Sequence, residues 1–212
     1  MPQINELIEI REDKEFNRTW WWTKSDIGAW NITRHEWLES HHIFFIKNLR
    51  GMDVCITAGA NHGIYTHAYS QRFKYVYAFE PDPVNFYCMV LNNPSTNVIK
   101  INAALSSAPG LINLNSTNSR NTGEHKVVLQ GNLSIPSMTI DMLGLHKCDL
   151  IQLDTEGYEW PIILGAKRTI ERLKPVVIAE NGKRREIADY LGSIGYVAKD
   201  TSFSDTIWVP KT

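Results

Sequence analysis

From Asp53 onward, short runs of apolar residues alternate with segments whose apolar positions recur at helical spacing. The apolar runs predict five strands, at 53–59 (DVCITAG), 75–82 (YVYAFEPD), 98–105 (VIKINAAL), 149–157 (DLIQLDTEG) and 175–181 (PVVIAEN). Three of them, centred on VCITA, LIQL and VVIA, are almost continuously apolar and rich in β-branched residues. Such strands are typical of a parallel sheet that is buried on both faces.

Three helices are predicted between or after these strands. The segment 83–93 stops at an Asn-Pro pair, which terminates a helix, and the segment 159–173 has Pro161 near its start, where proline is tolerated. The segment 183–195 ends at Gly195, a residue type that often closes a helix. This alternation of strands and helices favours a doubly wound α/β fold with a mostly parallel sheet.

Three further segments complete the predicted organisation. The tail, 196–210, predicts two strands around a Ser/Asp turn, so the chain should end in an antiparallel hairpin. The polar segment 112–137 interrupts the alternation and predicts an inserted hairpin with an Asn/Ser-rich tip. Residues 1–48 carry five of the seven tryptophans, and we expect them to form an aromatic-rich extension or lid on a core domain of residues 49–212.

Composition and charge argue against several classes of protein. The formal net charge is −1, and the densest basic cluster, 183–185, is more typical of a solvated helix start than of a nucleic-acid surface. The first 15 residues are too charged for a signal peptide, and no apolar run is long enough to cross a bilayer. The three scattered cysteines indicate reduced thiols in a cytoplasmic protein.

Polar residues gather where the predicted strands end, and ligands of an open parallel sheet bind beyond those ends. The first strand runs into Gly59 and Gly63, which permit a tight turn and close packing of the next helix. The second ends at Glu80, whose carboxylate can accept from both hydroxyls of a ribose. The fourth ends at Asp154 and the fifth at Glu180. The pattern predicts a site for a cofactor that contains a ribose.

The motifs AGANHGIYT, YAFEPDPVNF, INAAL, TIDML, DLIQLDTEGYEWPIILGA and PVVIAEN occur in one order along the chain. In that order and spacing, residues 53–181 resemble the FkbM-type methyltransferases, class I enzymes that depend on S-adenosylmethionine. FEPDP and DTEGYE are the strongest parts of the resemblance. It implies a Rossmann-like, seven-stranded sheet whose last strand is antiparallel. The aromatic N-terminal segment is more similar to the variant of this family found in phage genomes.

The resemblance also implies which residues bind the cofactor. Gly59, Ala60, Asn61 and Gly63 would face its methionine portion, and Glu80 would hold the ribose hydroxyls, with Pro81 and Asp82 shaping the adenosine pocket. Asn102 and Ala103 would lie near the adenine, and Asp154 near the methionine amino group and the transferring methyl.

One position, Thr57, departs from the family pattern, which usually has an aspartate there to help hold the cofactor's ammonium group. A threonine hydroxyl can accept a hydrogen bond but supplies no charge. A charge-assisted hydrogen bond contributes about 1.5–3 kcal/mol, against about 1 kcal/mol for a neutral one. We therefore expect about tenfold weaker cofactor binding, which Asp154 and backbone carbonyls can offset. The competing interpretation is a protein that has lost catalysis.

Methyl transfer to a hydroxyl group requires alignment with the sulfonium and removal of a proton. The candidate bases are Asp154 and Glu156, followed by Glu159, Glu180 and His62. Asp154, Glu180 and Asn181 also resemble the ligands of metal-dependent small-molecule O-methyltransferases, and oxygen ligands suit Mg²⁺, which would lower the pKa of the hydroxyl. The alternative is that Glu180 and Asn181 only cap the following helix.

The N-terminal aromatic residues admit two interpretations. Trp37, His41, Phe44, Phe45 and Leu49 fall near helical spacing, which predicts a helix packed on the sheet. Three consecutive tryptophans, 20–22, cannot all point inward from one strand. Trp22 and Trp30 are therefore candidates to cover the active site and stack on the acceptor. His35, His41 and His42 have no accompanying cysteine pair, so a zinc site is not favoured.

The sequence predicts a cytoplasmic, S-adenosylmethionine-dependent O-methyltransferase that acts on a hydroxyl of a sugar or another small metabolite. We expect no nucleic-acid or membrane partner, and the oligomeric state is left open. A nicotinamide-dependent oxidoreductase is an alternative because Glu80 would serve either ribose, although the glycine spacing and the terminal hairpin argue against it. A catalytically degenerate cofactor-binding protein is the other alternative.

Overall fold

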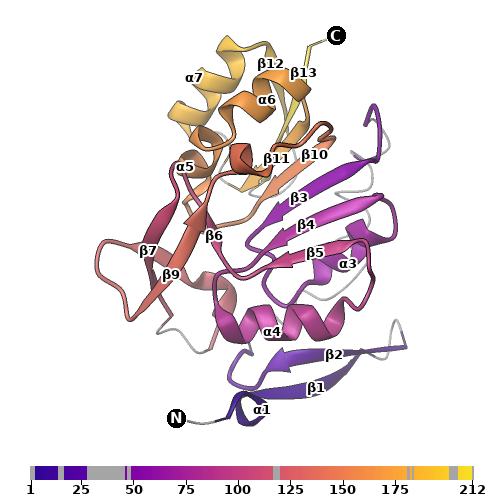
Figure 1. The fold of residues 1–212 in the computed structure, drawn as a ribbon, viewed down its shortest axis with the longest axis vertical. Coiled ribbons are helices and arrows are strands. Elements are labelled where there is room, and N and C mark those ends of the chain that lie inside the picture. The colour runs from indigo at the N-terminus through magenta and orange to yellow at the C-terminus, as the bar shows by residue number, and fades with distance from the viewer. Residues whose placement is uncertain are drawn as a thin grey trace.

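A seven-stranded sheet forms the centre of the protein (Figure 1). The computed structural model describes residues 3–13, 17–27, 46, 49–116, 120–180, 182, 184–200 and 205–211. In spatial order, the strands are β12 (Tyr196–Asp200), β13 (Asp205–Pro210), β11 (Val176–Glu180), β10 (Leu150–Leu153), β3 (Val54–Ala58), β4 (Tyr75–Phe79) and β5 (Val98–Ile101). The five strands from β11 to β5 are parallel, and β13 runs antiparallel to β11 and β12. The predicted mostly parallel sheet with a closing antiparallel hairpin is confirmed.

Helices cover both faces of this sheet, as its uniformly buried strands require. One apolar cluster contains residues of α5 (Glu159–Leu164), α6 (Lys167–Leu173) and α7 (Arg185–Ser193). The other contains residues of α3 (Ile64–Ser70) and α4 (Pro83–Asn92). Within β3, Ile56 belongs to the first cluster and Cys55 to the second, because successive side chains of a strand point to opposite faces. The expected doubly wound α/β fold is therefore present.

The segment predicted as one helix at 159–173 forms two, α5 and α6. The interruption falls at Gly165, where a Cβ atom would stand only 2.0 Å from the carbonyl oxygen of Ser106. The backbone passes so close to the neighbouring segment that only glycine fits. The short 3₁₀ helix η3 (Ile140–Leu143) packs nearby, and its Asp141 carboxylate accepts from the Thr169 backbone N–H at 2.8 Å.

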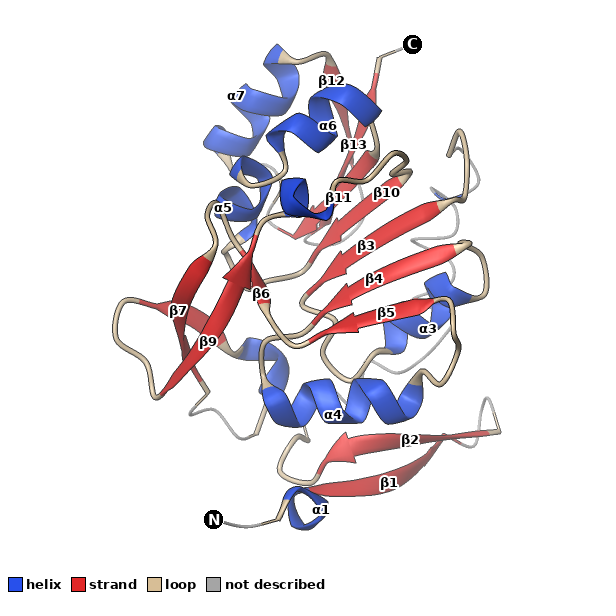
Figure 2. Cartoon of the chain, in the orientation of Figure 1, coloured by secondary structure: helices blue, strands red, loops and turns tan. Residues whose placement is uncertain are grey.

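The inserted segment is larger than the predicted hairpin. It forms a second, four-stranded sheet in the order β6 (Ala104–Leu105), β9 (Leu133–Met138), β7 (Gly110–Asn115) and β8 (Lys126–Val128), with the 3₁₀ helix η2 (Thr122–Glu124) before β8. The two-residue length of β6 and the proline within β9 explain why neither strand stands out in the sequence. This sheet lies beyond the carboxyl ends of β3, β4 and β5 (Figure 2).

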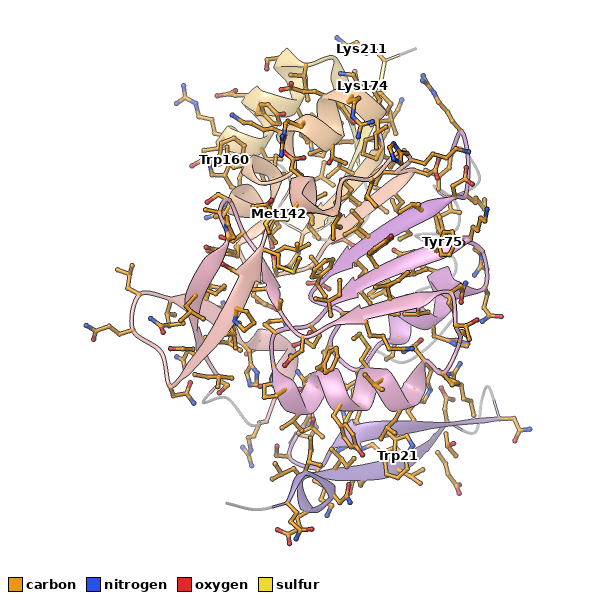
Figure 3. The ribbon with its side chains drawn as sticks, in the orientation of Figure 1. Trp21, Tyr75, Met142, Trp160, Lys174 and Lys211 are labelled. Atoms are coloured by element: carbon orange, nitrogen blue, oxygen red, sulfur yellow. The ribbon has the colours of Figure 1, made fainter. Side chains whose placement is uncertain are left out.

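The N-terminal segment begins with the single turn α1 (Ile4–Leu7) and continues as an antiparallel hairpin of β1 (Ile8–Asp13) and β2 (Arg18–Thr23). Trp20 and Trp22 are 0% and 1% exposed, whereas Trp21 is only partly buried, so the side chains alternate as a strand requires. Figure 3 places Trp21 on this hairpin, at the opposite end of the molecule from Lys211.

Strand β2 lies along α4, where the amide of Asn92 serves as its hydrogen-bonding partner. Asn92 Oδ1 accepts from the Trp21 backbone N–H at 2.7 Å, and Asn92 Nδ2 donates to the Trp21 carbonyl at 2.9 Å. The predicted helix between Trp37 and Leu49 falls almost entirely outside the described residues, as does Trp30. The division into residues 1–48 and 49–212 stays a prediction. Across the described parts of the chain, no helix has the length and apolar character needed to span a membrane.

Candidate active site

A cavity of about 200 Å³ opens at the carboxyl edge of the large sheet, with part of its wall supplied by the insert. Ten residues singled out from the sequence line it: Trp22, Gly59, Ala60, Asn61, His62, Glu80, Pro81, Ala103, Asp154 and Glu156. Six others do not: Thr57, Gly63, Asp82, Asn102, Glu159 and Glu180. Asn181 and Trp30 lie outside the described residues. The structure thus brings most of the predicted cofactor residues together around one space.

The turn after β3 is shaped by the closeness of its neighbours. Gly59 has φ +76°, and a Cβ atom there would lie 1.8 Å from the carbonyl oxygen of Asp154. Gly63 has φ +87°, and its missing side chain makes room for Asn93 and Met89 of the α4 region. Both positions therefore require glycine, the first beside the cavity and the second beneath it.

Glu80 is held rigidly at the end of β4. Its side chain is 5% exposed, its Oε2 accepts from the Asn61 backbone N–H at 2.7 Å, and its Oε1 accepts from the Asp82 backbone N–H at 2.9 Å. Burial, followed by the nearby charge of Asp82, raises the pKa of Glu80 to about 8. Each carboxylate oxygen keeps further lone pairs, so the group is oriented to accept from hydroxyls of a ligand.

Asp82 and Asn102 shape the loop that carries Glu80. Asp82 is the N-cap of α4, and its Oδ1 accepts from the backbone N–H groups of Val84 and Asn85. Its Oδ2 lies 3.3 Å from Nδ1 of His125 in the insert. Although burial acts to raise it, the hydrogen bond with His125 and those from α4 hold the pKa of Asp82 below its ordinary value. Asn102 Nδ2 donates to the Glu80 carbonyl at 2.8 Å.

Thr57 faces the interior of the sheet. It is fully buried opposite Gln152 of β10, and its hydroxyl lies 2.5 Å from Gln152 Oε1, to which it donates. The hydroxyl proton is therefore engaged within the sheet, and the residue does not line the cavity.

Three carboxylates meet where β10 and β11 end. Oxygen atoms of Asp154, Glu156 and Glu180 lie within 4.8 Å of one another. Burial is the main cause that raises the pKa of each of them, and the neighbouring acids add to it; for Glu180 the pKa reaches about 7. Lys126 of β8 approaches Glu156 at 3.7 Å. This cluster can take up a proton near neutral pH.

Glu159 holds the turn that carries the cluster. It is fully buried, and its Oε1 accepts from the backbone N–H groups of Thr155 and Gly157, both at 3.1 Å. In that turn, Glu156 has φ +55° and Gly157 has φ +97°. Of the candidate bases named from the sequence, Glu159 thus supports the loop rather than lining the cavity.

Part of the cavity wall gave no signal in the sequence. Asn121, Thr122, Gly123, His125 and Val127 of the insert line it, and they come from a polar stretch without periodicity. Thr122 is fixed there because its hydroxyl donates to the buried Asp26 at 2.6 Å. The N-terminal segment therefore meets the insert beside the cavity, a long-range contact that local pattern cannot reveal.

The strand order defines a doubly wound α/β protein, and its cavity lies over the carboxyl ends of the strands, where proteins of this class bind their ligands. Residues 58–198 match the methyltransferase FkbM domain, so the chain belongs to the FkbM methyltransferase family. Members of this family bind S-adenosylmethionine. The predicted family and enzyme class are confirmed, and the nicotinamide-dependent alternative is not supported.

Several known proteins and solved structures are similar to this chain. Hexuronic acid methyltransferase AglP of Haloferax volcanii is 29% identical over 133 residues, which cover 59% of this chain and 55% of that protein. Methyltransferase FkbM from Methylobacillus flagellatus KT superposes with a TM-score of 0.55 and 16% identity over 81% of this chain and 50% of that one. M. jannaschii TYW2 in complex with AdoMet gives a TM-score of 0.47 at 16% identity, covering 97% and 87%. This chain spans about half the length of the first two. The phage variant stays a prediction.

Proposed function

We propose that the chain is an S-adenosylmethionine-dependent O-methyltransferase that acts on a hydroxyl of a sugar or another small metabolite. One observation carries this proposal: Asp154 and Glu156, two acids able to take a proton, line the same cavity as Glu80. A cofactor whose ribose is held at Glu80 and an acceptor whose hydroxyl meets the acids would share one enclosed space.

The residues around Glu80 fit the cofactor. Its carboxylate has spare lone pairs for two ribose hydroxyls, and Oδ1 of Asn61 is buried without a partner among the residues that the structure describes, so it can receive a donor from a ligand. Gly59 and Ala60 allow the backbone to approach the cofactor, and Pro81 and Ala103 provide apolar wall. Gly63, Asp82 and Asn102 would contribute by fixing the shape of these turns.

In the proposed reaction, S-adenosylmethionine would supply the methyl group and leave as S-adenosylhomocysteine, and Asp154 or Glu156 would take the hydroxyl proton of the acceptor. A base works best when its pKa lies near the working pH. The raised pKa values of both carboxyl groups therefore suit the role. Trp22, which lines the cavity, is proposed to pack against the acceptor.

A metal offers a second route for the same proton. Asp154 and Glu180 lie within one 4.8 Å cluster, and carboxylate oxygens suit Mg²⁺, with Asn181 as the third predicted ligand. Magnesium would lower the pKa of the acceptor hydroxyl in place of a protein base. Excess chelator would then abolish methyl transfer while cofactor binding survives. Full activity in chelator would leave Asp154 or Glu156 as the base.

The acceptor class is proposed from the relative named hexuronic acid methyltransferase, which suggests a sugar. A cytoplasmic location without a nucleic-acid or membrane partner is part of the proposal. The net charge of −1 and the acidic cavity support the absence of a nucleic-acid partner, since nucleic-acid surfaces are basic.

The test is methyl transfer from S-adenosylmethionine to a panel of neutral glycosides and hexuronides, followed by mass spectrometry. Mild alkali then separates the products, because a methyl ester is hydrolysed and a methyl ether survives. We expect an alkali-stable product. A labile product would show that the acceptor is a carboxyl group. Cofactor binding without transfer to any compound would favour a catalytically degenerate cofactor-binding protein.

Variants identify the base. Asp154→Asn or Glu156→Gln removes the proton acceptor, and the responsible one should lower kcat by about 10²–10⁴-fold. Glu186→Gln, on the exposed surface of α7, is the matched control and should leave kcat unchanged. Wild-type rates in both active-site variants would show that neither acid takes the proton.

A further inference from the structure

His62 lies in the cavity wall, and a role as a general base does not account for its contacts there. It follows Asn61 in the turn after β3, is 1% exposed and lines the cavity. Its ring stacks on Trp22 of the N-terminal hairpin, with centroids 3.8 Å apart and planes at 16°. Its carbonyl oxygen accepts from Asn92 Nδ2 at 2.8 Å. The residue is thus fixed in orientation by two other elements.

The hydrogen bonds around the ring determine which nitrogen carries the proton. The backbone N–H of Thr23 points at His62 Nε2, 3.2 Å away. A backbone N–H can only donate, so Nε2 must present its lone pair. A neutral imidazole carries one proton, which then has to lie on Nδ1.

The neighbouring hydroxyl agrees with this assignment. Asn85 Nδ2 donates to the Thr122 carbonyl, which can only accept, and this fixes the orientation of the Asn85 amide. Asn85 Oδ1 therefore faces the Thr23 hydroxyl and receives its proton at 3.1 Å. The hydroxyl has no second proton for Nε2, 3.1 Å away, so the Thr23 backbone N–H is the donor.

The ring stays neutral in ordinary buffers. Burial lowers the pKa of His62 to about 3, and the positive charges of Arg11 and His125 act in the same direction, against the opposing charge of Asp82. His62 can therefore neither serve as a general base at neutral pH nor pair as a cation. Its Nδ1 is buried and has no partner among the described residues. A buried N–H without an acceptor lowers the free energy of unfolding until a ligand accepts its hydrogen bond.

We propose that His62 is a neutral hydrogen-bond donor to the adenosine part of the bound cofactor, set in its Nδ1–H form by Thr23 of the N-terminal hairpin. This inference rests on the proposed cofactor. The adenosine part is favoured over the cofactor's carboxylate because Asp82, whose charge acts on His62, is hydrogen-bonded through its backbone N–H to Glu80, the proposed ribose ligand. A neutral donor among acids suits a neutral acceptor such as a ring nitrogen or ribose oxygen.

The test compares two ligands in one variant. His62→Phe keeps the volume and the stacking on Trp22 but removes the donor. Calorimetry should show about tenfold weaker binding of both S-adenosylhomocysteine and 5′-methylthioadenosine, which lacks the carboxylate. His62→Asn restores an N–H near the Nδ1 position and should recover part of the loss. A loss confined to S-adenosylhomocysteine would place the donor at the carboxylate, and unchanged affinity for both would overturn the proposal.

Nitrogen NMR of the histidine rings provides a readout that a purely structural role would not change. The signals absent from His62→Phe belong to His62, and they should show a protonated Nδ1 and a bare Nε2 from pH 5 to 8. The Nδ1 signal should shift when 5′-methylthioadenosine binds. A proton on Nε2, or an Nδ1 signal that does not shift when the ligand binds, contradicts the inference. If the wild-type protein binds neither ligand, the proposed function fails, while the tautomer measurement still tests the geometry.

Discussion

Replacing Glu80 with glutamine tests the cofactor assignment most directly. The carboxylate is nearly fully buried, and each of its oxygens already accepts from a backbone N–H, so it cannot turn away from the cavity without breaking those bonds. A hydrogen bond to a charged group contributes about 1.5–3 kcal/mol. Glu80→Gln should therefore weaken S-adenosylhomocysteine binding about 10- to 150-fold, as measured by calorimetry at a pH above the pKa of Glu80, where the carboxylate is ionised.

The same substitution should change how stability depends on pH. Because the folded protein raises the pKa of Glu80 from 4.5 to about 8, the folded state binds the proton more tightly than the unfolded chain. This contribution is fully present below pH 4.5 and is lost as the pH rises through 8. It corresponds to at most about 5 kcal/mol of unfolding free energy. In denaturant titrations without cofactor, Glu80→Gln should flatten the decline between pH 4.5 and 8.

The control is Glu156→Gln, which alters a carboxylate at the other part of the cavity wall. It should leave the affinity for S-adenosylhomocysteine within about twofold, since it removes no proposed cofactor contact. Unchanged affinity in Glu80→Gln, or an equal loss in both variants, would refute the ribose assignment. An unchanged pH slope would show that Glu80 is already ionised in the folded protein.

Two further substitutions test the turns and the sheet. Gly59→Ala places a methyl group against the Asp154 carbonyl at a positive φ. It should lower the free energy of unfolding by more than about 2 kcal/mol, measured by denaturant titration. Wild-type stability would show that the two turns can separate. Thr57→Val leaves Gln152 Oε1 without its donor and should cost about 1–3 kcal/mol of stability while S-adenosylhomocysteine affinity stays within about twofold. A tenfold loss of affinity in a stable Thr57→Val variant would show that Thr57 contributes to cofactor binding.

The strands could be predicted from sequence because burial on both faces makes their own residues continuously apolar. Ile56 and its neighbours in β3 face apolar clusters on both sides, so the run is continuously apolar, and the residues that follow it must lie at the carboxyl edge. That reasoning located Gly59, Glu80 and Asp154. It could not locate Asn121 or His125, because their positions depend on contacts with distant segments.

Side-chain direction is a second limit of sequence reasoning. The motif placed Thr57 two residues before the glycine turn, which is its correct position, but only the pairing of β3 with β10 shows its hydroxyl meeting Gln152. His62 was a candidate base by residue type alone. Its neutrality follows from burial and from Thr23, which is 39 positions earlier in the chain.

The long-range contact between Asp26 and Thr122 also has a consequence for how the chain is made. The two residues are 96 positions apart, and Asn85, which links Thr23 to Thr122, lies between them. At about 5–20 residues per second, ribosomes need roughly 5–20 s to reach Thr122 after Asp26 has been added. Until α4, along which this strand lies, has been added, the hairpin strand with its three tryptophans has no surface to cover, so we expect this nascent segment to be a preferred substrate for chaperones.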